Sequence, residues 1–158
     1  MGKGLRVTAV GAALVTSALL IPGAVASAGA SDDGNGRGRT MQFDVEFSPP
    51  GYTDFDEPGF SSPDVITFHD TLLRDGEQVG HEVGSCVLVD PSGLANCTGV
   101  VTLDGRGTIT FAFENAPPPE KTLAVTGGTG EFRSAGGEGT LVENGDGTGT
   151  LTLSLDRH

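Results

Sequence analysis

The chain contains the stretch Gly107-Thr108-Ile109-Thr110-Phe111-Ala112-Phe113-Glu114, in which large apolar residues alternate with small or polar ones. The segment from Gly149 to Asp156 repeats this pattern, with leucine at every second position from Leu151 to Leu155. Alternation with a period of two places one set of side chains on each face of an extended chain. Both stretches therefore predict β-strands that are buried on one face.

Six further segments have a strand-like pattern, and short turn sequences separate most of them. The segments are Met41–Ser48, Val65–Leu73, Val79–Asp90, Leu94–Leu103, Thr122–Thr126 and Glu138–Glu143. Asp75-Gly76, Asp104-Gly105 and Asn144-Gly145 are typical hairpin turns, because Gly and Asn accept positive φ at little cost. Eight strands joined by hairpins predict an all-β, antiparallel, up-and-down β-barrel, whose closure removes exposed sheet edges. A flattened two-sheet sandwich is the alternative.

The connection from Pro49 to Pro63 is the one long excursion between predicted strands, and it carries the acidic residues Asp54, Asp56 and Glu57. Two interpretations are open. The loop covers a mouth of the barrel, or it is a flexible crossing.

The N-terminal residues 1–26 have the layout of a secretory signal peptide. Lys3 and Arg6 precede an apolar run that ends at Pro22, and Ala24-Val25-Ala26 follows as a cleavage pattern. A membrane anchor is the alternative, but the run is shorter than the ~20 apolar residues that span a bilayer. Residues 27–40 are polar and Gly-rich, which predicts a disordered lead-in. Residues 41–158 are then a single barrel domain of a secreted, extracellular protein.

The charge of the chain excludes some partners. The net charge is −12, and loss of Lys3 and Arg6 with the signal peptide makes it −14. Nucleic acid requires a basic surface, so it is not an expected partner. The same charge argues against binding to anionic membranes after the signal peptide is removed.

Cys86 and Cys97 flank the turn Asp90-Pro91-Ser92-Gly93, so a hairpin about this turn brings the two cysteines opposite each other. Export would place them in an oxidising compartment, which favours a disulfide. A free, reactive Cys86 is the alternative.

Several motifs suggest other functions but are incomplete. Thr126-Gly127-Gly128-Thr129-Gly130 resembles a phosphate loop, yet Arg133 stands where a dinucleotide motif needs glycine, and a tight turn is favoured. The three histidines form no spaced cluster, and neither Asp54–Glu57 nor Asn144–Thr148 has the ordered oxygen positions of a calcium loop. No metal site is predicted.

Asp70 interrupts the apolar face formed by Ile66, Phe68 and Leu72. A carboxylate that faces a barrel interior is partly desolvated, which raises its pKa and suits it to acid–base chemistry. A structural role for Asp70, or a position at the wet rim, is the alternative. Asp44 and Glu46 also share a face, and they line the interior only if Phe43, Val45 and Phe47 point outward.

Three segments resemble the allene oxide cyclase and dirigent barrel family. They are Val65–Leu73, the Gly84-Ser85-Cys86-Val87-Leu88 run, and Leu123–Gly139, which contains the Thr-Gly-Gly-Thr-Gly signature followed by an aromatic residue. The segments occur in the order and spacing of the family, and together they cover about half of the precursor.

The resemblance implies an eight-stranded, calycin-like barrel with an apolar cavity, often trimeric, that needs no cofactor. Its members hold a reactive molecule in one shape while a few polar groups stabilise developing charge. Asp70 stands where the plant cyclases have a pocket asparagine, and Cys86 where they have a pocket cysteine. The candidate catalytic residues are therefore Asp70, Glu46 and Asp44, and the candidate ligand-binding residues are Phe68 and Cys86.

The leading hypothesis is a secreted isomerase, either a cyclase or a stereochemistry-directing protein of the dirigent type, acting on a small apolar or phenolic molecule. The first alternative is a non-catalytic extracellular barrel that binds such a molecule. A structural protein with a filled barrel is the second.

Overall fold

The computed structural model describes residues 38–56, 58–116 and 119–156. They form nine strands and one short 3-10 helix: β1 (Arg39–Glu46), β2 (Gly51–Thr53), β3 (Val65–Arg74), β4 (Glu77–Leu88), β5 (Ala95–Leu103), β6 (Gly107–Asn115), β7 (Glu120–Gly128), η1 (Gly130–Phe132), β8 (Gly137–Glu143) and β9 (Thr148–Leu155). The predicted signal peptide lies outside the described residues, as does most of the predicted lead-in. The first strand begins at Arg39, two residues before the predicted start of the domain.

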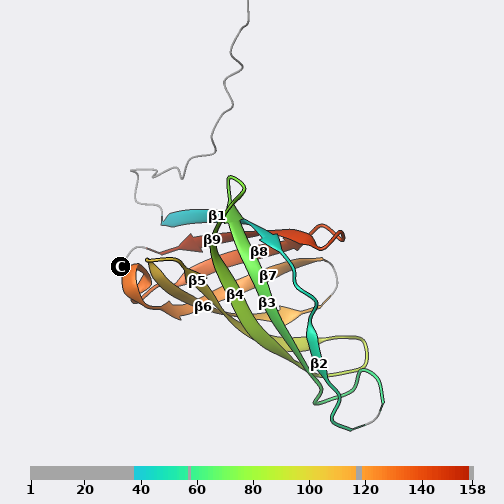
Figure 1. The fold of residues 1–158 in the computed structure, drawn as a ribbon. Coiled ribbons are helices and arrows are strands. Elements are labelled where there is room, and N and C mark those ends of the chain that lie inside the picture. The colour runs from blue at the N-terminus through green and yellow to red at the C-terminus, as the bar shows by residue number, and fades with distance from the viewer. Residues whose placement is uncertain (1–37, 57, 117–118, 157–158) are drawn as a thin grey trace, which may run out of the picture.

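Eight of the strands close into an antiparallel barrel, which confirms the predicted fold (Figure 1). Strands β3 to β9 pair in chain order, and β1 pairs with both β9 and β3. All described pairings are antiparallel. The alternating residues of β1 and β9 fill the interior, where Phe43, Val45, Leu151 and Leu153 are almost fully buried.

Strand β2 lies outside the barrel and was not predicted from the sequence. It pairs with the start of β3, and the two project with the end of β4 at the lower right of Figure 1. The loop that follows β2 is held by the fully buried carboxylate of Asp64, which accepts hydrogen bonds from Tyr52 Oη (2.7 Å), Phe55 N (2.9 Å) and Ser61 N (2.7 Å). These bonds keep the pKa of Asp64 below its ordinary value. These hydrogen bonds hold the loop in one conformation. We call β2 and the described residues of this loop, 51–56 and 58–64, the arm.

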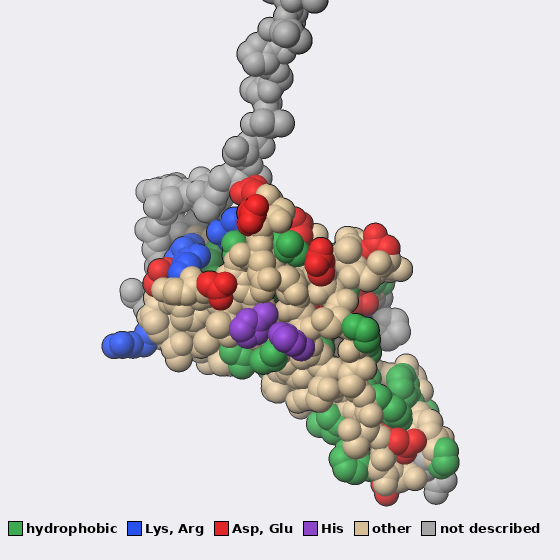
Figure 2. Space-filling model, viewed as in Figure 1, with side chains coloured by type: hydrophobic (Ala, Val, Ile, Leu, Met, Phe, Trp, Pro, Cys, Tyr) green, Lys and Arg blue, Asp and Glu red, His purple; other side chains and the backbone are tan. Residues whose placement is uncertain are grey.

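Exposed apolar side chains gather on this projecting arm, as the lower part of Figure 2 shows. Tyr52, Phe55 and Phe60 come from the arm, and Val87 and Val89 come from the neighbouring end of β4 and the residue after it. Val83 and Val87 lie on the outer face of β4, with Glu82, Cys86 and Leu88 on the inner face.

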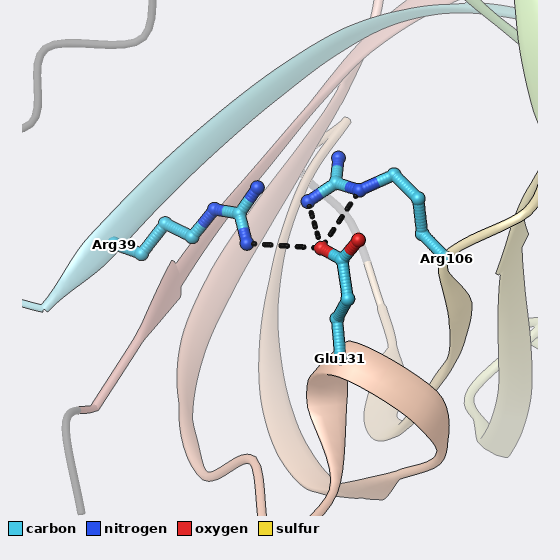
Figure 3. A network of polar contacts seen from close by, with 3 residues as sticks. All are labelled: Arg39, Arg106 and Glu131. Atoms are coloured by element: carbon cyan, nitrogen blue, oxygen red, sulfur yellow. Dashed lines mark hydrogen bonds and ion pairs between the residues drawn. The ribbon is translucent and has the colours of Figure 1, made fainter.

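One end of the barrel is closed by η1. Phe132 is buried in the main core, and the guanidinium groups of Arg39 and Arg106 lie 5.8 and 5.2 Å from its ring centroid. Both arginines also bind Glu131 (Figure 3), Arg106 through Nε at 3.0 Å and Nη2 at 2.9 Å, and Arg39 at 3.5 Å. The glycine-rich Thr126–Phe132 segment is thus the end of β7 and the start of the connection to β8, and this connection contains a 3-10 helix where a tight turn was predicted. Gly130 adopts a φ of 61° there.

Candidate functional site

The other half of the barrel contains a cavity of about 250 Å³. It is lined by the ends of β1, β4, β6 and β8 and by the starts of β3 and β7. This is the opposite end of the barrel from the one that η1 closes. Most of its wall is apolar: Phe47, Pro50, Ile66, Phe68, Cys86, Phe111, Phe113, Leu123 and Leu141. Its polar lining residues are Ser48, Asp70, Glu82, Asn115 and Glu143. A concave apolar site with a few polar groups is the usual form of a small-molecule site.

Two glycines create the space for the aromatic part of this wall. Gly84 and Gly99 face each other across β4 and β5. A Cβ atom on Gly84 would collide with the ring of Phe68, and a Cβ atom on Gly99 would collide with the ring of Phe111. The end of each phenylalanine ring therefore occupies the space that a side chain on the neighbouring glycine would need.

Replacing Gly99 with valine should destabilise the protein by about 1–3 kcal/mol, because the new side chain displaces Phe111 from a filled position. Urea unfolding would measure the loss. Thr98→Val is the matched control, since Thr98 is exposed on the outer face of the same strand and its replacement should stay within about 0.5 kcal/mol of the native protein. An equally stable Gly99→Val protein would show that the ring does not occupy this space.

Asp70 is buried and lines the cavity, as its position on the apolar face predicted. Its side chain is 4% exposed, and Asp70 Oδ1 accepts a hydrogen bond of 2.8 Å from the backbone N–H of Ser48. Burial raises the pKa of Asp70, while the Ser48 bond and the nearby charge of His69 oppose part of the rise. The bond also ties the chain after β1 to β3 at the edge of the cavity.

Glu82 is the functional candidate that the sequence analysis missed. It lies directly opposite Asp70 in the pairing of β3 with β4, and it is 2% exposed. Burial, with repulsion from Asp70 as a smaller contribution, raises the pKa of Glu82 to about 7. Among the described residues none donates a hydrogen bond to its carboxylate, which lines the cavity. Burying a carboxylate that has no hydrogen-bond donor from the protein lowers the stability of the fold, so its presence in the cavity indicates a function.

A signal for Glu82 was present in the spacing of β4. The family resemblance placed Cys86 in the pocket, and Glu82, four residues earlier on the same strand, shares its face. The disulfide between Cys86 and Cys97 is confirmed. Cys86 and Phe68, the two candidate ligand-binding residues, both border the cavity.

The structure does not bring Asp44 and Glu46 to the cavity. Both are exposed on the outer face of β1, while Phe43 and Val45 fill the inner face. The expectation that they line the pocket is wrong because the larger apolar side chains of the strand occupy the interior. Phe47 and Ser48, which follow the strand, are the residues of this segment that reach the cavity.

The described residues contain no group of three His, Cys, Asp or Glu side chains placed to share a metal ion. Within the same part of the chain, no helix is long and apolar enough to cross a membrane. Two interpretations of the Pro49–Pro63 loop were open, a cover for the barrel mouth and a flexible crossing. Pro50 is its one described residue that lines the cavity, so only the start of the loop lies at the mouth.

The fold and the cavity define a class: closed antiparallel barrels with an apolar cavity at one end, whose wall includes buried acidic side chains. No protein-family model matches the sequence, and no curated protein matches it significantly. Among solved structures, pyocyanin demethylase is 31% identical, with a TM-score of 0.66 over 73% of this chain and 98% of that protein.

Two more distant structures share the fold. The pterocarpan synthase dirigent protein GePTS1 is 22% identical, with a TM-score of 0.51 over 73% of this chain and 84% of that one. The Diels-Alderase AbmU from Streptomyces koyangensis is 12% identical, with a TM-score of 0.54 over 77% and 71%. The chain belongs to the family of pyocyanin demethylase, within the allene oxide cyclase and dirigent-like barrels.

Proposed function

We propose that this protein is a cofactor-independent enzyme that binds a small aromatic or phenolic molecule in the barrel and moves a proton on it with Asp70 and Glu82. The observation that carries the proposal is the buried pair of opposed carboxylates in an otherwise apolar cavity. A cavity of about 150 Å³ binds benzene, so 250 Å³ suits a molecule of two or three fused rings.

The two carboxylates have the properties that acid–base catalysis requires. A group whose pKa is about 7, as for Glu82, can both accept and donate a proton near neutral pH. The Ser48 N–H bond favours the ionised form of Asp70, so Asp70 is the proposed base and Glu82 the proposed acid. Cyclisation or isomerisation of a phenolic or enolic substrate needs such a transfer and no added oxidant or reductant.

Demethylation of an aromatic molecule is the second candidate reaction. It is favoured by the 31% identity to pyocyanin demethylase across nearly the whole of that protein. Pyocyanin is therefore the first compound to test, with the disappearance of the dye and its products followed by liquid chromatography and mass spectrometry.

Replacing Asp70 with asparagine should lower kcat by about a hundredfold or more on any substrate that the native protein turns over. The amide oxygen keeps the acceptor for Ser48 N–H, so the pocket should remain intact and KM should change little. Glu138→Gln, an exposed change on the outer face of β8, is the matched control. Full activity of Asp70→Asn would remove Asp70 from the mechanism. A native protein that retains such compounds without converting them would instead support the non-catalytic binding barrel.

We also propose that the protein is exported and assembles as a homotrimer. The signal-peptide pattern of residues 1–26 supports export, and a disulfide is compatible with an extracellular protein. The outer faces of β4 and β5 support self-association. Small uncharged side chains such as Ser85, Thr98 and Val100 lie beside the exposed Val83 there, with His69 opposite it on β3, on a chain that is otherwise strongly acidic.

A further inference from the structure

The charged side chains that line the cavity are all acidic. Among its described lining residues there are three carboxylates, Asp70, Glu82 and Glu143, and no lysine, arginine or histidine. Lys121 lies close to Glu143, with Nζ 3.9 Å from Oε1, so the charge of Glu143 is partly balanced. No ion pair joins Asp70 or Glu82 to a described cation.

The same wall is rich in aromatic rings. Phe47, Phe68, Phe111 and Phe113 all line the cavity, and the ring centroids of Phe111 and Phe113 are 6.0 Å apart. The face of an aromatic ring is negative, so it attracts a cation and repels an anion. The ring faces and the carboxylates therefore both attract a positively charged molecule and both repel a negatively charged one.

We infer that the cavity selects flat aromatic cations over neutral molecules of the same shape, and that it rejects aromatic anions. The inference rests on the proposed function, because it names the class of molecule that the proposed site takes. A delocalised cation suits this site because it is weakly hydrated, stacks on phenylalanine, and can pair with Asp70 and Glu82, which form no ion pair with a described cation.

The test compares three fluorescent probes of similar shape: N-methylacridinium, neutral 9-methylacridine and acridine-9-carboxylate. Titrations of the full mature chain are made at about pH 8.5, above the pKa of about 7 of Glu82, so that this carboxylate is largely ionised. The native protein is expected to bind the cation about tenfold or more tightly than the neutral probe, and to bind the carboxylate more weakly than either.

The variant Asp70→Asn/Glu82→Gln should lose this preference while its affinity for 9-methylacridine stays within about threefold. That neutral probe also reports that the pocket is still folded. The control is Glu114→Gln, which removes an exposed carboxylate from β6 and should leave the preference intact.

The outcomes separate the two proposals. Equal binding of cation and neutral probe by the native protein, or a preference that survives in the double variant, would overturn the cation inference and leave the aromatic binding site standing. Failure of all three probes to bind would contradict the binding site itself, and the inference would fall with it.

Discussion

Replacing Glu82 with glutamine is expected to abolish acid–base turnover and, at the same time, to make the protein more stable above neutral pH. Glutamine keeps the size of the side chain and cannot carry the proton that the proposed mechanism moves. The expected fall in kcat is about a hundredfold to ten-thousandfold, the usual contribution of a positioned acid or base.

The gain in stability follows from the raised pKa of Glu82. Its pKa is 4.5 in the unfolded chain and about 7 in the folded protein, so between these values the folded state holds a proton that the unfolded state has released. The free energy of unfolding therefore falls as the pH rises through this window, and the loss is complete above the folded pKa. The shift corresponds to about 3 kcal/mol. The Glu82→Gln variant has no titrating group at this position, so its free energy of unfolding does not fall for this reason.

Urea unfolding at about pH 4 and pH 9 measures the effect, because these values lie outside the window on either side. The native protein should lose about 3 kcal/mol more than Glu82→Gln between the two conditions. Glu138→Gln should follow the native protein, since it removes an exposed charge and not a buried one. If the free energy of unfolding changes equally with pH in the native protein and in Glu82→Gln, then Glu82 is not buried as an unpaired acid.

An inactive variant that is more stable would distinguish a catalytic from a structural role. A carboxylate that served the fold would leave a destabilised protein when it was neutralised. A carboxylate kept in the cavity for its chemistry costs stability, and its removal releases that cost.

The sequence predicted the architecture well because the barrel is local in its construction. Each hairpin was visible as two alternating stretches and a turn, and closure followed from the number of strands. β2 could not be predicted in this way: its three residues, Gly51–Thr53, have no apolar alternation, and they form a strand because β3 extends beyond the barrel and offers an edge.

The site was predicted only in part, for reasons that differ from residue to residue. Asp70 was visible because it breaks a run of large apolar neighbours. Glu82 was hidden because its neighbours on the inner face of β4 are Gly80 and Gly84, while Val83 and Val87 face outward. Asp44 and Glu46 share one face of β1, but that face is exposed, because the apolar side chains of Phe43 and Val45 are buried in the interior.

Breaking the Cys86–Cys97 disulfide is expected to lower the free energy of unfolding by about 3 kcal/mol. The bond closes a loop with a sequence separation of 11, and the loss of unfolded-chain entropy for so short a loop has about this size. Cys97 is fully buried, and the two cysteines form a small core of their own with Leu88 and Ala95, where β4 and β5 leave the barrel.

Two comparisons separate the cross-link from the volume of the side chains. The native protein is unfolded with and without reductant, which keeps both sulfur atoms, and Cys86→Ala/Cys97→Ala is unfolded alongside, which removes them. If the cross-link dominates, the reduced native protein and the double variant should both be about 3 kcal/mol less stable than the oxidised protein. A reduced protein as stable as the oxidised one would show that packing of Leu88, Ala95 and the sulfur atoms holds this end, and that the bond contributes little. Because Cys86 also borders the cavity, affinity for an aromatic probe should weaken in the double variant only if the β4–β5 wall loosens, which links the stability of this end of the barrel to the binding of its ligand.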